Sequence, residues 1–354
     1  MKKIIISIIL FVFANLGYGQ VNKLVVDAII SKAKIQPTMY GIFFEDINFA
    51  ADGGLYAEMI KNRGFEFEKP MMGWLEPNTN RFSLNKNSGS AEIIKTLDSK
   101  SNRNICRVTV NNDKSYVLLN EGFSGMGIKK NALYRLSLRA AKQSIDIRKI
   151  NFTFVNKDGK ELGTSSILPD GRDWMTYKTQ IKAIATEAKA KLKITFEGKG
   201  VIDLDMISLF PIDTWKGRKN GLRKDLVQLL YDLKPGFLRF PGGCIVEGRT
   251  LAKRYQWKNT MGPVEGRKVL INRWNTEFKH RLTPDYFQSF GLGFFEYFQL
   301  AEDIGAEVKV ADNLNIFIET FNDSADKKAN AKKTAYQQTV EQGSQRASSR
   351  CSSR

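Results

Sequence analysis

The sequence predicts an α/β fold of parallel βα units, interrupted by an all-β antiparallel sandwich and followed by a disordered C-terminal tail. Apolar runs alternate with helical segments before residue 74 and again after residue 212, which is the order of parallel βα units. Between these two regions, short alternating runs follow one another at regular spacing, as in an antiparallel sandwich. Beyond Ile318 large apolar residues are nearly absent, so that segment cannot bury enough surface to become ordered.

The N-terminus has the layout of a secretory signal. Lys2 and Lys3 precede an apolar run over 4–16, and the small residues Gly17 and Gly19 follow it. The run is shorter than the roughly 20 apolar residues of a membrane-spanning helix. We therefore expect a signal peptide over residues 1–19 and an exported protein, periplasmic or extracellular, with no stable membrane anchor.

The first βα unit is expected within residues 20–73. The segment "MYGIFFEDI", Met39 to Ile47, is a compact apolar run that ends in Glu-Asp, which predicts a buried strand. The segment "GGLYAEMIKNRGF" that follows places Leu55, Met59 and Ile60 at helical spacing. It predicts a short helix over residues 53–65.

Residues 74–212 are expected to form the inserted sandwich. The predicted strands are the runs "ICRVTV", "YVLLN", "YRLSLRA", "INFTFVNKDGKELG", "MTYKTQIKAI", "KLKITFEGKG" and "VIDLDMISLF". Turn signals such as Lys-Asp-Gly and Glu-Gly-Lys-Gly separate them. The region is an insertion because the βα pattern resumes after it.

Residues 213–318 are expected to continue the βα units. A helix is predicted after Asn220, with one apolar face made of Leu222, Leu226, Leu229 and Leu233. The brief strand in "FLRFPGGCIVEG" follows. Further along the chain, the sequence predicts a helical region that starts at Thr283-Pro284, a helix "FFEYFQLAEDIGA" that ends at the glycine of its last turn, and a strand over 307–315. Residues 319–354 are expected to be a disordered tail.

Composition excludes several kinds of catalytic site. The chain has one histidine, His280, and three cysteines, Cys106, Cys244 and Cys351. A histidine-rich metal site is therefore excluded, and a disulfide framework is disfavoured. His280 lies in the charged stretch "EFKHR", where a solvated surface position is expected. Carboxylates and arginines remain as the reactive groups, and we expect no metal and no cofactor.

The formal charge of +18 raises the question of nucleic-acid binding. Half of the excess lies between Lys129 and Lys199, with 16 Lys/Arg against 7 Asp/Glu. These charges alternate with apolar residues in strand-like runs and form neither a basic helix nor an aromatic-basic ladder. We expect a solvated basic face and no nucleic-acid partner, with binding to an acidic polysaccharide or a cell surface left open.

Two predicted strand ends carry polar residues that suit a ligand site. In parallel βα folds ligands bind at the carboxyl ends of strands, and here those ends present Glu45 and Arg239. Arg239 could bind paired ligand oxygens, while Gly242 and Gly243 allow close approach of the backbone. An equally good alternative is a buried ion pair between Arg239 and Glu45 that joins the two strands.

Three further residues in this turn and in the loop that follows it suit the predicted ligand site. Cys244 has no histidine placed to activate it, so we expect it to line the pocket and not to act as a nucleophile. Trp257 and Trp274 suit stacking on a sugar face, although packing in the core is the commoner role of a tryptophan.

Three long segments carry a family resemblance: "YGIFFEDINFAADGGLYAEMIKNRGFEF", "LDMISLFPIDTWKGRKNGLRKDLVQLLYDLKPGFLRFPGGCIVEG" and "DYFQSFGLGFFEYFQLAEDIGAE". Over roughly Val25 to Val310 the chain resembles the N-terminal part of the α-L-arabinofuranosidases of glycoside hydrolase family 51. The form resembled has a carbohydrate-binding-like sandwich between the first two barrel strands. The resemblance implies an incomplete (β/α)8 barrel of about three strands plus the sandwich.

The resemblance also implies a function. It implies retaining hydrolysis of terminal α-L-arabinofuranosyl residues on arabinose-containing polysaccharides such as arabinan and arabinoxylan. Glu45 and Arg239 match residues that hold the sugar where cleavage occurs. Cys244 matches a subsite position that is asparagine in other branches.

The sequence departs from the family at the catalytic pair. A retaining glycosidase needs two carboxylates about 5 Å apart, and in the family these are glutamates on later strands, the first directly after an asparagine. Asn120-Glu121 is the one Asn-Glu pair and lies in the predicted sandwich, and Glu319 lacks the motif. No catalytic acid or nucleophile is assigned, and we expect a truncated, inactive chain; a reading-frame change near Lys309 would account for the truncation. The alternative is a non-catalytic carbohydrate-binding protein that acts through its sandwich.

Overall fold

The computed structural model describes residues 24–26, 29 and 33–310, with gaps at 80–81, 84–87, 97–102, 112–114, 145, 249–252 and 275–285. The predicted signal peptide, the predicted tail, His280, Glu319 and Cys351 lie outside the described residues. The chain divides into the units Met1–Met39 and Tyr40–Arg354. In the first unit the structure describes the short helix η1 (Pro37–Met39).

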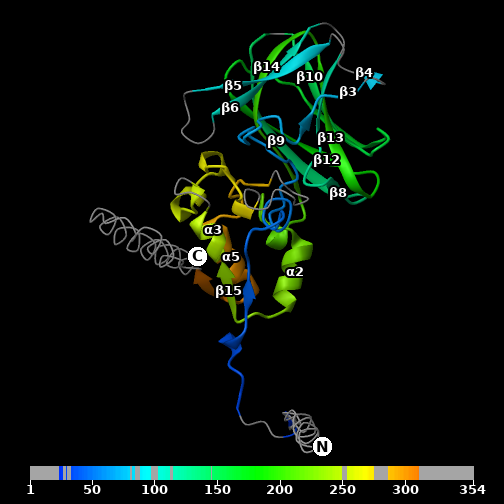
Figure 1. Ribbon diagram of the computed structural model, residues 1–354. Helices are drawn as coiled ribbons and strands as arrows, with labels where there is room; N and C mark the ends of the chain where they lie inside the picture. Colours follow the sequence, from blue (N-terminus) through cyan, green and yellow to red (C-terminus); the bar gives the residue numbers. More distant parts are fainter. Residues whose placement is uncertain are drawn as a thin grey trace, which may run out of the picture. The chain divides into compact units, whose positions relative to one another are not determined.

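A three-stranded parallel sheet lies in the second unit, in the order β1 (Ile42–Phe43), β15 (Phe237–Phe240) and β18 (Glu307–Val310). β1 pairs with β15 through Ile42↔Leu238, and β15 pairs with β18 through Leu238↔Val308. The helices α2 (Lys224–Asp232) and α5 (Phe294–Ile304) precede β15 and β18 (Figure 1). The predicted parallel βα order is confirmed for these three strands.

The helix α5 agrees with the sequence in its buried face and in its end. Phe294, Tyr297, Leu300 and Ala301 are buried, and Gly305 caps the helix in the left-handed conformation with φ 71°.

The helix α2 buries a face shifted from the one predicted: Leu222 and Leu226 pack against the core as expected, whereas Leu229 and Leu233 do not. Val227 is fully buried, whereas Leu229 and Leu233 are 63% and 60% exposed. Leu226 and Leu230 flank Val227 and pack against the core that surrounds α5. The leucine spacing is helical, but the neighbouring elements cover only the Val227 side.

Two predicted helices are absent from the described residues. The segment 53–65 forms turns and isolated bridges, such as Tyr56↔Leu222. Its backbone cannot be helical throughout, because Asn62 and Phe65 have φ of 58°. After the predicted start at Pro284, residues Phe287–Gln288 form the strand β17, which pairs with β16 (Leu270–Ile271).

The sandwich consists of two antiparallel sheets whose strands all fall within residues 74–211. The six-stranded sheet contains β2 (Trp74–Leu75), β7 (Tyr116–Asn120), β8 (Met126–Ile128), β10 (Lys149–Val155), β11 (Glu161–Ile167) and β13 (Glu187–Glu197). The five-stranded sheet has the order β12 (Met175–Lys182), β9 (Leu133–Lys142), β14 (Gly200–Pro211), β6 (Asn104–Val110) and β5 (Gly89–Lys95). Their inner faces bury one apolar core that includes Phe152, Phe154, Leu136, Leu192 and Ile202.

Short elements complete the described chain. They are β3 (Asn78–Thr79), β4 (Phe82–Ser83), η2 (Trp215–Gly217), α3 (Gly243–Glu247), η4 (Trp257–Thr260) and η5 (Val264–Gly266). Among the described residues, no helix has the length and apolar character needed to cross a membrane.

The segment before β2 is tied to the end of β14 by backbone and side-chain hydrogen bonds. The Met59 amide donates to the Leu209 carbonyl at 2.9 Å, and the Leu209 amide donates to the Glu58 carboxylate at 2.9 Å. The Ile207 amide donates to the Arg63 carbonyl at 3.0 Å. These bonds join the first βα connection to the last strand of the sandwich.

Candidate sugar-binding site

The carboxyl ends of β1 and β15 bring the predicted site residues together. The parallel register pairs Phe43 with Arg239, and the Phe44 amide donates to the Arg239 carbonyl at 2.8 Å. Glu45 follows directly after this pair. The chain leaves β15 through the cis peptide bond Phe240–Pro241 and enters α3, which begins beside Glu45.

Gly242 allows the Glu45 side chain to lie against the β15–α3 turn. Its φ is 103°, a conformation that glycine adopts readily. A Cβ at this position would lie 2.5 Å from Glu45 Cγ and 2.6 Å from its Cδ. The Pro-Gly-Gly turn therefore packs directly against the Glu45 side chain.

Glu45 is a carboxylate with one buried oxygen free of hydrogen bonds. Within the described part of the chain, Oε1 of Glu45 has no hydrogen-bond partner. Burial raises the pKa of Glu45 above its ordinary value. The Ile245 amide and the Trp274 indole oppose this rise in pKa, as do the guanidinium groups of Arg239 and Arg273.

Arg239 does not form the ion pair that the sequence left open. Its guanidinium carbon lies 4.5 Å from the centre of the Phe43 ring. Among the described salt bridges none joins Arg239 to Glu45. Both charged groups therefore stand at the same strand ends without neutralising each other through direct contact.

Cys244 is a half-buried cysteine in the first turn of α3 and is not part of a disulfide. Its carbonyl accepts a hydrogen bond from Arg273 Nη1 at 3.3 Å. Arg273 Nη1 also donates to the Gly248 carbonyl at 3.3 Å and to the Glu247 carboxylate. Arg273 thus fixes both ends of the short helix that carries Cys244.

The tripeptide Asn272–Trp274 links the two strand ends. Asn272 is fully buried; its Nδ2 donates to the Asp46 carbonyl at 2.6 Å, and its Oδ1 accepts from the Trp274 amide at 2.9 Å. Asn272 and Arg273 were not singled out from the sequence. Arg and Trp recur in the sequence between the β15–α3 turn and Pro284, but no local pattern indicates which residue of such a loop contacts a strand end.

The two tryptophans differ in their surroundings. Trp257 packs against the core, with its ring centre 5.7 Å from that of Phe294. Trp274 lies beside Glu45, where its indole lowers the pKa of that carboxyl group. Trp274 is therefore the aromatic residue at the site, and Trp257 has a packing role.

Two buried aspartates lie behind the site and hold its loops. Asp46 accepts hydrogen bonds from the Ala51 amide at 2.9 Å and from the Tyr286 hydroxyl. Asp52 accepts from the amide and hydroxyl of Ser289 at 2.7 Å and 2.8 Å. Burial, with repulsion from Asp52, raises the pKa of Asp46 to about 7. Because both carboxylates are buried and engaged, they act as structural anchors.

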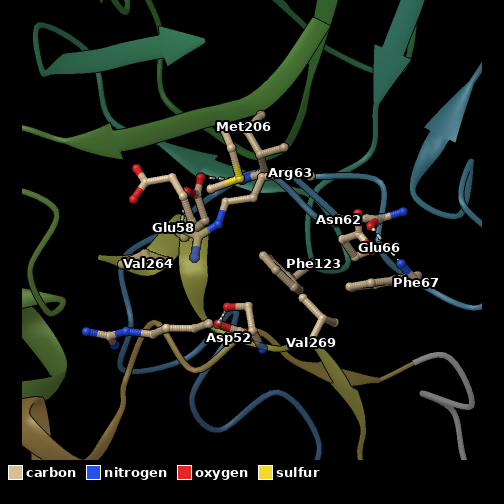
Figure 2. A pocket seen from close by; sticks show the side chains of 15 residues that line it. Asp52, Glu58, Asn62, Arg63, Glu66, Phe67, Phe123, Met206, Val264 and Val269 are labelled. Carbon is tan, nitrogen blue, oxygen red and sulfur yellow. Dashed lines mark hydrogen bonds and ion pairs between the residues drawn. The ribbon is translucent and has the colours of Figure 1, made fainter. Parts of the chain in front are cut away.

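A small cavity whose lining does not include Glu45 lies between the first βα connection, the sandwich and the segment 264–269. Its volume is about 30 Å³, which is room for one or two water molecules. Figure 2 shows Glu58 and Arg63 close together at one side of it, and Asp52 at another. Glu58 accepts from the Ile60 and Leu209 amides at 3.0 Å and 2.9 Å and pairs with Arg63 at 3.3 Å. Its acceptors are occupied, so Glu58 itself is not available as a free acid or base in this cavity.

The pair Asn120-Glu121 is structural. Asn120 is buried and exchanges hydrogen bonds with the Lys61 backbone at 3.2 Å and 3.0 Å, while Glu121 pairs with the Lys61 side chain at 3.4 Å. This pair ties β7 of the sandwich to the first βα connection.

Known proteins resemble this chain in sequence and in fold. Residues 229–343 match the family described as the alpha-L-arabinofuranosidase 1 domain. An extracellular exo-alpha-L-arabinofuranosidase of Streptomyces chartreusis is 35% identical over 301 residues, which is 79% of this chain and 33% of that protein. Alpha-L-arabinofuranosidase 1 of Arabidopsis thaliana is 35% identical over 285 residues, covering 77% of this chain and 40% of the relative.

A solved structure agrees with the sequence matches. An arabinose-bound GH51 α-L-arabinofuranosidase superposes with a TM-score of 0.67 and 28% identity, over 77% of this chain and 44% of that one. The chain thus spans between a third and a half of the length of these proteins.

Proposed function

This chain is a glycoside hydrolase family 51-like protein, and on that premise we propose that its parallel sheet provides the arabinofuranose-binding part of an α-L-arabinofuranosidase. The reaction is retaining hydrolysis of terminal, non-reducing α-L-arabinofuranosyl residues on polysaccharides such as arabinan and arabinoxylan. The names of the relatives and the arabinose-bound structure support this proposal.

One observation carries the proposal: the buried, unpartnered oxygen of Glu45 beside the guanidinium of Arg239. A buried acceptor without a donor costs about 1–3 kcal/mol. A sugar hydroxyl supplies the missing donor to Glu45. Arg239 donates to neighbouring ring or hydroxyl oxygens, and Cys244 with the Pro-Gly-Gly turn lines the floor.

The described residues supply binding groups but no assignable catalytic pair. Retaining cleavage needs two accessible carboxyl groups about 5 Å apart, one to protonate the leaving oxygen and one to attack the sugar. Asp46, Asp52 and Glu58 are buried and hydrogen-bonded within the fold. We therefore propose that these 354 residues, taken by themselves, bind arabinofuranose without hydrolysing it.

Export is part of the same proposal. The predicted signal over residues 1–19 and the name of the extracellular relative from Streptomyces chartreusis support it.

Titration with methyl α-L-arabinofuranoside, followed by ligand-observed NMR, tests the binding step. The purified chain should bind the sugar, and Glu45→Gln should weaken binding at least tenfold because the acceptor charge is lost. The matched control Glu302→Gln removes the same charge from an exposed position on α5 and should bind as the parent does. Equal binding by both variants would refute the site.

An aryl α-L-arabinofuranoside assay tests the catalytic step, with a full-length relative as positive control. The chain should show no turnover. Turnover comparable to that of the relative, abolished by a point mutation in this chain, would show that a catalytic pair has been overlooked.

A further inference from the structure

The outer face of the β9–β12 ladder in the sandwich carries a row of polar side chains that the proposed function does not use. β12 is the edge strand of the five-stranded sheet. Its residues alternate in exposure: Tyr177 and Ile181 face inward, while every second residue from Thr176 to Lys182 is exposed. β9 alternates in the same way, with Leu136 and Leu138 buried between less buried polar neighbours.

The pairing register sets one cation on each rung of this face. Directly opposite pairs are Thr176↔Arg139, Lys178↔Ser137, Gln180↔Arg135 and Lys182↔Leu133. Successive rungs on one face are two residues apart, which is about 7 Å in an antiparallel sheet. Positive charges thus recur at about 7 Å and alternate between the two strands, with a hydroxyl or an amide opposite three of the four. We call the eight residues Trp174, Thr176, Lys178, Gln180, Lys182, Arg135, Ser137 and Arg139 the β9–β12 strip.

Trp174 closes one end of the strip with an exposed aromatic ring. Its side chain is 38% exposed, and the guanidinium carbon of Arg139 lies 5.4 Å from the ring centre. The loop before it is held in place by Tyr177, whose hydroxyl accepts from the Asp170 and Gly171 amides at 3.2 Å and 3.0 Å. A large ring is therefore presented at a fixed position, where it can stack on a ligand.

The four cations have no direct carboxylate partner among the described residues. None of Arg135, Arg139, Lys178 or Lys182 appears in a described salt bridge. On the neighbouring strand β14 the buried Asp205 is the register partner of Arg139, and Asp173 precedes Trp174 in the chain. Lysines on an edge strand also protect it from pairing with other chains, but that role needs neither the exposed tryptophan nor the arginines of the inner strand.

We propose that the β9–β12 strip binds an acidic polysaccharide, with carboxylates of successive uronate residues on its cations and one sugar ring stacked on Trp174. The alternation of cations with hydroxyl and amide groups matches a polymer that carries both carboxylates and hydroxyls. A single-stranded nucleic acid is less well matched, because its bases stack on several aromatic residues in turn and the strip has one. The strip shares no residue with the Glu45 site.

The test uses the full chain and sodium polygalacturonate, with affinity measured by isothermal titration calorimetry. The variant Lys178→Gln/Lys182→Gln should bind at least tenfold more weakly than the parent. Its matched control, Lys157→Gln/Lys160→Gln, removes the same charge from the exposed turn between β10 and β11 and should change affinity less than twofold. Trp174→Ala should weaken binding about fivefold, and its control, Leu168→Ala at another exposed apolar site in the same loop, should not.

Three further ligands test whether binding requires the carboxylates of the polysaccharide. Fully methyl-esterified polygalacturonate keeps the sugar chain but lacks the charge, and it should bind at least tenfold more weakly. Linear arabinan and single-stranded DNA should bind weakly and without response to the variants. The proposal is overturned if polygalacturonate does not bind, if both lysine pairs weaken binding equally, or if arabinan or DNA binds as tightly and depends on the strip. All substituted side chains are exposed, and thermal unfolding of each variant verifies that the fold is kept.

Discussion

The sandwich and the parallel-sheet region bury different kinds of side chain. Between the two sheets of the sandwich the buried residues are mainly apolar, such as Phe152, Phe154 and Ile202. Around the parallel sheet and its connections, buried charged and amide groups are frequent, among them Asp46, Asp52, Glu58, Arg63, Arg267 and Asn272. The sandwich is thus stabilised by packing between its layers, whereas the parallel region combines an apolar core around α5 with polar contacts that hold loops at the strand ends.

The two regions also differ in how far apart their pairing partners lie in the sequence. β10 and β11 pair across one short turn, from Val155↔Glu161 to Ile150↔Ile167. β1 and β15 pair across nearly 200 residues through Ile42↔Leu238 and Phe43↔Arg239. Closing the short loop between β10 and β11 has a small entropic cost, which favours their pairing. The parallel strands pair only after a much longer stretch of chain has been brought together, which has a larger entropic cost.

The largest effect on stability is expected in the sandwich core. Phe152→Ala should lower the free energy of unfolding by about 3–5 kcal/mol, because it leaves a cavity between the two sheets. Phe43→Ala, at a half-exposed ring on β1, should cost much less. Urea unfolding followed by circular dichroism measures both, and similar losses would contradict the contrast between the regions.

A smaller effect on stability, but a large one on binding, is expected at Gly242. Gly242→Ala should lower the free energy of unfolding by about 1–3 kcal/mol, since the residue is held at φ 103°. It should also abolish arabinofuranoside binding, because the new Cβ displaces Glu45.

Gly262→Ala is the control for Gly242→Ala. Gly262 has φ 82° and no heavy atom within 4 Å of an added Cβ. It therefore carries the backbone strain without the contact to Glu45. Loss of binding in both variants would indicate that strain, and not the position of Glu45, governs the site.

The free energy of unfolding should depend on pH through Asp46, one of the buried carboxyl groups of the parallel region. The pKa of Asp46 is raised from 3.8 to about 7, so between these values the folded state binds more protons than the unfolded state. Stability should therefore fall as the pH rises from about 4 to about 7, by at most about 1.4 kcal/mol per pH unit for this one group. Asp46→Asn should flatten the slope in urea titrations at several pH values. An unchanged slope would show that Asp46 is not the group responsible.

The smallest effect is expected on the exposed side of α2. Leu229→Gln should change the free energy of unfolding by less than about 0.5 kcal/mol, whereas Val227→Ala on the buried side should cost about 2 kcal/mol. Thermal unfolding compares the two. A larger loss for Leu229→Gln would mean that the predicted leucine face is buried in solution.

Local sequence patterns were sufficient where the structure depends on neighbours along the chain. The strands of the sandwich follow from alternating residues, since Leu136 and Leu138 point to the core and Arg135 and Arg139 do not. The end of α5 follows from Gly305, because glycine adopts the left-handed cap without strain. The strand ends at Glu45 and Arg239 follow from short apolar runs that stop at charged residues.

The tertiary structure decided what local patterns leave open. Residues 53–65 have helical spacing but fold into turns, because Glu58 and Arg63 are used in the junction with β14. The leucine spacing predicted an apolar face on α2, but the elements that pack against the helix bury Val227 and leave Leu229 exposed. Asn272 and Arg273 reach the strand ends from a loop far away in the sequence, through bonds to Asp46 and Cys244. The sequence by itself determined most of the strands, the helices α2 and α5 and the charged groups of the site. Contacts between residues far apart in the sequence decided the conformation of residues 53–65 and the positions of the side chains that support the site, because a local segment does not contain the energies of those contacts.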